Sequence, residues 1–133
     1  DGTRSSGFMA EAARDLTGVQ IDKLAEAFGR QAAVQTDLSE ADSESPGGQL
    51  ATRGTDDVPA CTACHGPGRR ADAPIAPAVA GQSKDYLEIQ LKLWRNGQRG
   101  GGKRAALMRK AAQNLSDSDI RMLAEWYAAL PPT

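Results

Sequence analysis

The sequence has only two cysteines and one histidine, and it is poor in large apolar residues. Leu, Ile, Val and Phe together make up 21 of its 133 residues, below the roughly 20% that is usual for a self-sufficient hydrophobic core. The net charge is only −1, so the strong self-repulsion typical of a disordered chain is missing too. These shortages favour a folded chain whose interior is completed by a bound cofactor.

Long apolar runs and strand-like alternation are also missing. No apolar run approaches the roughly 18 residues that a membrane-spanning helix needs, so we expect no transmembrane segment, and we expect no nucleic-acid partner. The length of 133 residues suits one domain of ordinary size with an appendage. Because no segment alternates between apolar and polar residues, we predict an all-helical fold.

Charge is unevenly distributed along the chain. Residues 1–59 carry a net charge of −6, and residues 60–133 carry a net charge of +5. Such asymmetry bears on partners and on association rates rather than on the fold. We divide the chain into a helical segment at 1–35, an acidic Ser- and Gly-rich linker at 36–47, and a domain at 48–133.

Apolar spacing and capping residues predict four helical stretches. The first carries Thr17 as a possible cap, and a short second one covers residues 48–54. The third is capped by Ser83 and closed by Gly97. The last begins at a Ser-x-x-Asp capping box and ends at two prolines. We expect Trp126 and Tyr127 of this helix to pack against residues 48–53. The residues that define its start, its apolar face and its end are Ser116, Asp119, Ile120, Leu123, Ala124, Tyr127, Pro131 and Pro132.

The first and last of these stretches resemble one another at an offset of 99 residues. Eight identities fall between Met9 and Phe28, including Met9 with Met108 and Leu16 with Leu115. Two Ala- and Leu-rich amphipathic helices can drift together, but agreement that runs from a Met through a loop to a capped helix favours tandem duplication. We expect Met9 to be a buried remnant.

Both cysteines and the only histidine lie in the run CTACH at positions 61–65, which is the pattern for covalent attachment of a c-type haem. Thiols three positions apart on a helical turn can reach the two vinyl groups of one porphyrin. The adjacent imidazole of His65 is then placed under the iron. A dithiol redox pair would need a strand and a βαβ frame, and a zinc site would need two more ligands, so both alternatives are weaker.

An iron held by one histidine needs a sixth ligand or an open position, and methionine is the available strong-field donor. Met122 lies one place off the apolar face of the last helix and is expected to pack there. Met108 follows the stretch RNGQRGGGKRA, which we interpret as a flexible loop able to cross the opposite haem face. We therefore expect iron ligation by His65 and Met108.

The chain from about residue 48 to 130 resembles a class I cytochrome c, most closely one domain of the two-haem periplasmic cytochromes of the c-four type. The resemblance rests on CTACHGPG, APAVAGQSKDYLEIQLKLWRNGQR and MRKAAQNLSDSDIRMLAEWYAAL, in the family's order and spacing. It implies a helical fold wrapped around one haem c. It also implies that Cys61 and Cys64 carry the haem, with His65 proximal and Met108 distal.

The resemblance assigns three further residues. The carbonyl of Pro77 would accept the Nδ1 proton of His65, which fixes the imidazole tautomer. Trp94 and Arg95 would face the haem propionates. In the two-haem members a complete first domain precedes the second, whereas residues 1–30 resemble only the end of such a domain. The chain is therefore either a fragment of a dihaem protein or a single-haem protein that keeps the end of a lost domain.

With both axial positions filled, the expected function is outer-sphere electron transfer between redox partner proteins, not catalysis. The alternatives are a haem subunit of a larger periplasmic oxidoreductase and a peroxidase or gas-binding protein. Attachment of haem c outside the cytoplasm implies a periplasmic location, and no signal peptide is visible in the chain.

A cluster of basic residues flanks Met108, and we expect it to attract an acidic docking surface of a redox partner. The alternatives are that the cluster is an ordinary solvated surface, or that the acidic segment 37–57 of the same chain folds over it. The residues of the cluster are Lys103, Arg104, Arg109 and Lys110, with Arg95 and Arg99 nearby.

Overall fold

The computed structural model describes residues 7–31, 38, 41–66, 76–99 and 102–131. Within these ranges the chain forms seven α-helices and no β-strand, as the absence of alternating segments predicts. The chain divides into two compact units, Asp1–Ala33 and Val34–Thr133. None of the described helices is both long and apolar enough to cross a membrane.

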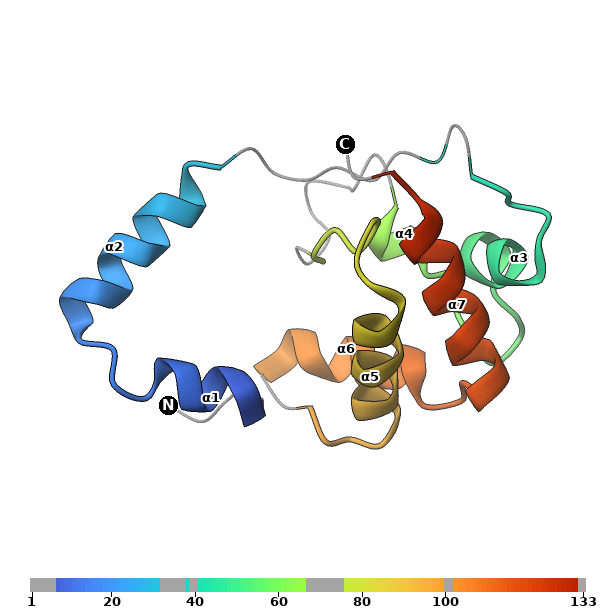
Figure 1. Ribbon diagram of the computed structural model, residues 1–133. Helices are drawn as coiled ribbons and strands as arrows, with labels where there is room; N and C mark the ends of the chain where they lie inside the picture. Colours follow the sequence, from blue (N-terminus) through green and yellow to red (C-terminus); the bar gives the residue numbers. More distant parts are fainter. Residues whose placement is uncertain (1–6, 32–37, 39–40, 67–75, 100–101, 132–133) are drawn as a thin grey trace. The chain divides into compact units, whose positions relative to one another are not determined.

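The first unit consists of α1 (Gly7–Ala13) and α2 (Gly18–Gly29) (Figure 1). Thr17 caps α2 as predicted, because its side chain accepts a hydrogen bond from the backbone N–H of Gln20. The Gln20 side chain accepts in return from the backbone N–H of Thr17, at 2.8 Å. This reciprocal arrangement satisfies N–H groups that have no partner within the helix.

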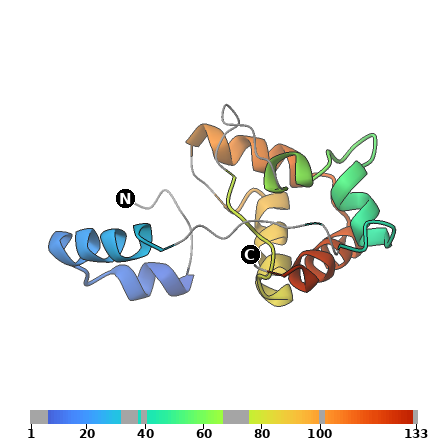
Figure 2. The same cartoon turned by 90° about the horizontal axis from the view of Figure 1, so that it is seen from above.

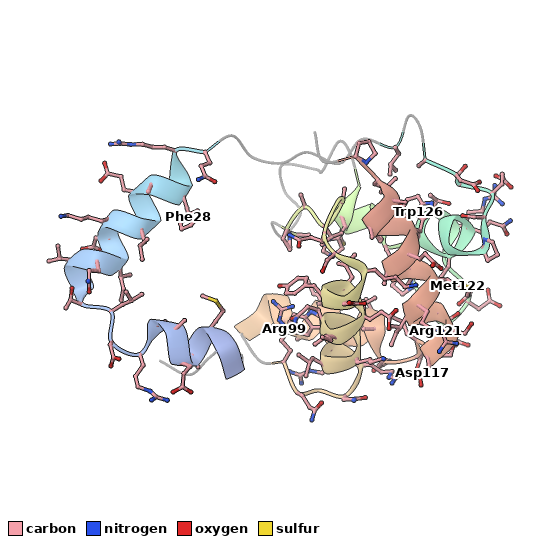
Figure 3. All side chains as sticks on the ribbon, in the orientation of Figure 1. Phe28, Arg99, Asp117, Arg121, Met122 and Trp126 are labelled. Carbon is pink, nitrogen blue, oxygen red and sulfur yellow. The ribbon has the colours of Figure 1, made fainter. Side chains whose placement is uncertain are left out.

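The apolar face of α2 is uncovered. Ile21, Leu24 and Phe28 are 51%, 43% and 67% exposed, and the side chain of Phe28 stands out from the helix in Figure 3. Met9, expected to be buried, is 65% exposed, so that prediction is wrong. Two short helices offer no third layer to cover an apolar side chain, which is why α2 buries none of its described residues.

The second unit contains five helices that surround one core (Figures 1 and 2). They are α3 (Pro46–Arg53), α4 (Thr62–His65), α5 (Lys84–Arg95), α6 (Gly102–Ala112) and α7 (Asp117–Ala129). Helix α7 packs against α3 and α5, α5 also packs against α6, and α3 lies beside α4. Helix α3 begins at Pro46, two residues before the start of the short helix predicted at 48–54.

Polar residues cap the N-termini of three of these helices. Ser83 caps α5, and Ser116 and Asp119 form the predicted capping box of α7. Ser45 caps α3, where its hydroxyl accepts from the backbone N–H of Gly48 at 3.1 Å. Because each cap satisfies N–H groups that the helix leaves unpaired, helix starts are readable from the sequence.

The core is centred on the inner face of α7. Ile120 and Leu123 are 0% and 1% exposed. Trp126 is buried as predicted, and its indole N–H donates to the carbonyl oxygen of Asp42 at 2.9 Å. That bond ties α7 to the chain that leads into α3. The remaining members of the core cluster are Leu50, Ala51, Val58, Ala80, Leu87, Ala112, Leu115, Ala124, Tyr127 and Leu130.

Helices α3 and α7 approach one another closely at Gly47. A Cβ atom at Gly47 would lie 2.4 Å from the carbonyl oxygen of Met122 and 3.1 Å from the Cβ atom of Trp126. Since the first contact is with backbone, it cannot be relieved by a side-chain rotation. Glycine is therefore required for this packing.

We predict that Gly47→Ala lowers the free energy of unfolding by about 1–3 kcal/mol, the usual cost of overpacking a well-packed interface. The measurement is denaturant unfolding of the purified protein. Gly29→Ala is the matched control, because a Cβ atom there meets nothing within 4 Å. Equal stability of the Gly47→Ala variant and the wild type would contradict this account of the α3–α7 contact.

Candidate functional site

The two thiols and the imidazole sit on one helical turn. The backbone N–H groups of His65 and Cys64 both donate to the carbonyl oxygen of Cys61, at 2.9 and 3.2 Å. Gly66 ends the turn, and a Cβ atom there would lie 2.4 Å from the carbonyl oxygen of Thr62. The tight turn places Cys61 and Cys64 on one side of α4, as the spacing predicts.

The two thiols have different surroundings. Cys61 is half-buried and packs against the core, whereas Cys64 is exposed. Burial, the largest influence, raises the pKa of Cys61 to about 11; a backbone hydrogen bond opposes this and the nearby Cys64 adds to it. Cys61 is therefore a neutral thiol at neutral pH.

The imidazole of His65 is oriented by the backbone. Its Nδ1 atom lies 2.8 Å from the carbonyl oxygen of Pro77. A carbonyl oxygen can only accept, so this contact requires the proton on Nδ1 and leaves the lone pair on Nε2. In the half-buried ring, Nε2 is thus the nitrogen whose lone pair a metal can use.

Met108 lies on a helix rather than on a loop. The last four residues of the segment interpreted as flexible, 102–105, belong to α6 (Gly102–Ala112), so that interpretation is wrong for them, while Gly100 and Gly101 lie outside the described residues. The Ala, Lys, Arg, Leu and Met residues that follow Gly102 are strong helix formers, and they override the glycine signal. Met108 is half-buried and packs against the same core cluster as Cys61.

Trp94 and Arg95 lie at the end of α5. Trp94 is half-buried against the core, and the guanidinium of Arg99 lies 4.8 Å from its ring centroid. The Nη1 atom of Arg95 donates to the carbonyl oxygen of Leu115 at 3.1 Å and to the Asp117 carboxylate at 2.7 Å. Arg95 therefore ties α5 to the start of α7, and its contact with a propionate stays a prediction.

The basic cluster is only partly described. Arg109 and Lys110 are exposed on α6 next to Met108, and Arg99 is half-buried beside Trp94. The side chains of Lys103 and Arg104 lie outside the described residues. Of the described residues, Arg109 and Lys110 thus follow Met108 on α6, while Arg99 lies beyond the end of α5.

The sequence predicted only a packing role for Tyr127. It is 5% exposed, and within the described ranges its hydroxyl has no hydrogen-bond partner. Burial raises its pKa, and the charges of Cys61 and Cys64 act in the same direction. A tyrosine at a core position of α7 is the only sequence signal that singles it out.

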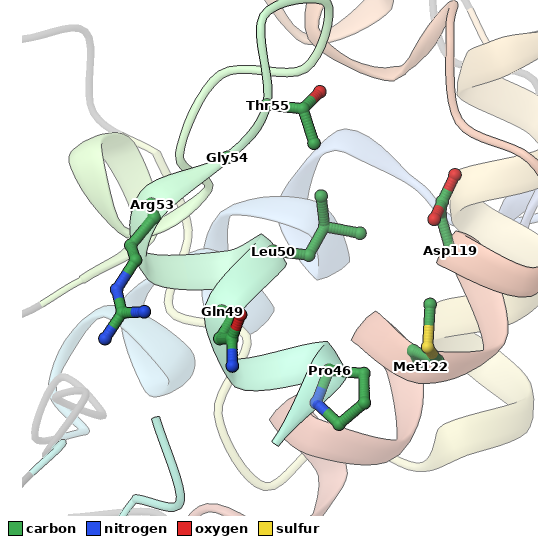
Figure 4. A pocket seen from close by; sticks show the side chains of 8 residues that line it. All are labelled: Pro46, Gln49, Leu50, Arg53, Gly54, Thr55, Asp119 and Met122. Atoms are coloured by element: carbon green, nitrogen blue, oxygen red, sulfur yellow. The ribbon is translucent and has the colours of Figure 1, made fainter. Parts of the chain in front are cut away.

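A groove between α3 and α7 lies apart from these groups (Figure 4). Leu50 and Met122 face one another across it, with Asp119 at one end. Met122 is half-buried there, in the packing position expected for it. None of Cys61, Cys64 or His65 lines the groove, so it is separate from the candidate site.

The chain is similar in sequence to several known proteins. A family model described as cytochrome c matches residues 46–130. The thiosulfate dehydrogenase electron acceptor of Thiomonas intermedia is 34% identical over 98% of this chain and 62% of its own length. Cytochrome c-554(548) of Halomonas halodenitrificans is 48% identical over 59% of this chain and 94% of its own.

A solved structure is similar over both units. Reduced cytochrome c4 from Pseudomonas stutzeri superposes with a TM-score of 0.72 at 29% identity, covering 96% of this chain and 68% of that one. The chain spans less than two thirds of the thiosulfate dehydrogenase electron acceptor that it matches. The similarity thus covers the whole of this sequence but only part of that longer relative.

The contact between Arg95 and Asp117 predicts a pH effect. The hydrogen bond from Arg95, and then its charge, hold the pKa of Asp117 below its usual value of 3.8. A depressed folded pKa stabilises the native state above the unfolded pKa, and this contribution is lost as pH falls through the folded pKa. Asp117→Asn should therefore be less stable than the wild type at neutral pH, with the difference shrinking below about pH 4 and vanishing as pH falls through the lower folded pKa of Asp117.

Thermal unfolding of the wild type and the variant across pH 2–7 measures this difference. The control is Arg121→Gln, because Arg121 lies on the same helix as Asp117 (Figure 3) and makes a smaller contribution to its pKa. A stability difference that stayed constant between neutral and acid pH would contradict the assignment.

Proposed function

Since this chain belongs to the cytochrome c family, we propose that it carries single electrons on one haem c attached through Cys61 and Cys64. The family is one of electron-transfer proteins that bind haem c covalently. The observation that carries the proposal is the single turn at α4. That turn presents two thiols on one side and an imidazole oriented by Pro77.

The described residues fit such a group. The thiols of Cys61 and Cys64 are free to form thioethers, and His65 offers Nε2 as the proximal ligand. Met108 offers a half-buried thioether sulfur as the distal ligand. The haem, when bound, supplies an iron that changes between the ferric and ferrous states. With both axial positions held by side chains, no bond to iron need form or break during electron transfer.

The chain's own residues then set the conditions for that exchange. Pro77 holds the imidazole ring in one orientation and increases its donor strength. A methionine ligand favours the ferrous state, and the apolar core disfavours the additional charge of ferric iron, so we expect a positive reduction potential. The core cluster against which Cys61 and Met108 pack includes Leu87, Leu123 and Tyr127, with Leu91 and Trp94 packed against it as well.

We further propose that residues 1–35 are the end of a preceding cytochrome domain. The repeat between Met9 and Phe28 supports this, as does a similarity to the thiosulfate dehydrogenase electron acceptor that covers 98% of the chain. The uncovered face of Ile21, Leu24 and Phe28 supports it as well. In α7 the equivalent face is buried by α3 and α5, for which the first unit has no counterpart among its described residues.

The proposed location is the periplasm, because haem c is attached to such motifs outside the cytoplasm. The proposed donor is a thiosulfate dehydrogenase, by similarity to its electron acceptor in Thiomonas intermedia. The chain would then act as an electron-carrying partner or subunit, with no catalysis of its own. Exposed Arg109 and Lys110, which directly follow Met108 on α6, would draw an acidic surface of the donor towards the haem.

Replacing Met108 tests the axial ligation. The wild type should have a mass equal to the chain plus one haem, with the weak far-red band of sulfur-to-iron charge transfer in its ferric spectrum. The Met108→Ala variant should lose this band and its iron should become high-spin, because we propose no other described side chain as a replacement ligand. Met122→Leu is the matched control and should keep the band.

Two results would alter the proposal. A far-red band that persists in Met108→Ala would remove Met108 as the ligand. A wild-type spectrum that is already high-spin would favour the peroxidase or gas-binding alternative, since the iron would then have an open position.

Reversing charge next to Met108 tests the docking surface. Arg109→Glu combined with Lys110→Glu should slow reduction by the thiosulfate dehydrogenase of the same cell at least about tenfold at low salt, because steering of this kind changes association rates by 10- to 1000-fold. The rate is measured by stopped flow with thiosulfate present, and the difference should shrink at high salt. Arg121→Glu is the control, because Arg121 is exposed on α7. Equal rates at low salt would exclude this surface, and no reduction of the wild type would exclude this donor.

A further inference from the structure

The guanidinium of Arg99 lies over the ring of Trp94, just beyond the end of α5. Its Cζ atom is 4.8 Å from the ring centroid, within the roughly 6 Å over which a cation is attracted to an aromatic face. Both residues are half-buried, and such a contact is stronger where water is partly excluded. The ligation proposed above assigns no role to Arg99.

The chain reverses direction between these two residues. Gly97 has a φ of +68°, and its backbone N–H donates to the carbonyl oxygen of Trp94 at 3.1 Å. The next N–H, that of Gln98, donates to the carbonyl oxygen of Leu93 at 2.9 Å. These two bonds form a Schellman motif, which ends a helix with a residue in the left-handed region. Because glycine adopts that region at little cost, the turn at Gly97 returns Arg99 to the last turn of α5.

Arg99 is also close in sequence to α6, which begins three residues later at Gly102. Three residues of chain span at most about 11 Å, so the contact with Trp94 limits where α6 can begin. Helices α5 and α6 pack against each other, and Trp94 and Met108 both pack against the core cluster. The contact between Arg99 and Trp94 therefore restrains the helix that carries Met108.

This restraint matters for the proposed axial ligand. A methionine thioether is uncharged and a weak acceptor, so an added ligand such as imidazole can replace it on iron. The fraction of molecules in which the sulfur is detached then depends on how firmly α6 is held. The sequence positions that hold α6 are thus relevant to ligation even where they lie outside the ligand set.

We propose that the contact of Arg99 with Trp94 fastens the start of α6 to the end of α5 and thereby keeps Met108 on the iron. This inference rests on the proposed ligation by Met108. Arg99 is a positioning residue, since it acts through the helix that carries the ligand. Its loss leaves the ligand set intact and increases the fraction of molecules in which the sulfur is detached.

The test is a titration of the ferric protein with imidazole, which binds the iron only where the sulfur of Met108 has left it. Loss of the far-red band follows this exchange, and the apparent affinity rises with the fraction of detached sulfur. Arg99→Gln should bind imidazole about two- to fivefold more tightly than the wild type, because a cation–π contact at a partly exposed site changes an equilibrium constant by about that factor. Arg121→Gln, at an exposed position of α7, is the matched control and should bind imidazole as the wild type does.

Two further variants identify the contact as the cause. Arg99→Lys keeps a cation that can lie over the ring, so its imidazole affinity should be closer to that of the wild type than the affinity of Arg99→Gln is. Gly97→Ala places a side chain at positive φ, where a Cβ atom meets nothing within 4 Å. It therefore strains only the turn and should raise the imidazole affinity as well. Gly29→Ala, at the end of α2 with equal room for a Cβ atom, is its control.

The outcomes separate this inference from the proposed function. A wild type without the far-red band would remove ligation by Met108, and this inference with it. If the band is present but Arg99→Gln binds imidazole only as tightly as the wild type, the role of Arg99 alone is overturned. A lower stability of Arg99→Gln in denaturant with an unchanged imidazole affinity also overturns it, because the contact would then support the fold without holding the ligand.

Discussion

The second unit depends on the burial of one face of α7. Ile120 and Leu123 are almost completely enclosed, and α3 and α5 both pack on the helix that carries them. Large aliphatic and Phe side chains are scarce in this sequence, and α7 contributes five buried residues to the core: Ile120, Leu123, Ala124, Trp126 and Tyr127. Cys61, Trp94 and Met108 all lie against the same cluster. The candidate site is therefore positioned by the core rather than by a separate scaffold.

Polar contacts refine the arrangement that the core sets. The carbonyl of Pro77 orients His65, although the two are twelve residues apart in the chain. Arg95 joins α5 to the start of α7 through a carbonyl and a carboxylate. Each contact is worth little where it is exposed, but together they hold the elements that carry the imidazole and the core in a defined relation.

The two copies of the repeated sequence have different environments. The face that α7 buries with Ile120 and Leu123 corresponds to Ile21 and Leu24 of α2, which are 51% and 43% exposed. The helical pattern and the cap are the same in both, because they depend on local chemistry. Burial differs because it depends on what lies alongside: α7 has α3 and α5, while α2 has no such layers within its unit.

Local features of this protein were determined by the sequence itself. Thr17, Ser83 and Ser116 predicted the starts of α2, α5 and α7 correctly, and the absence of alternating segments predicted the all-helical fold, since caps and periodicity act over only a few residues. The spacing of Cys61, Cys64 and His65 likewise predicted a shared turn and the covalent haem of the family. The helix around Met108 was missed, because glycines suggest a loop where the following Ala-rich segment favours a helix. Only the tertiary structure decided which groups became buried: it exposed Met9 and enclosed the Tyr127 hydroxyl, because burial is set by neighbours that are distant in sequence.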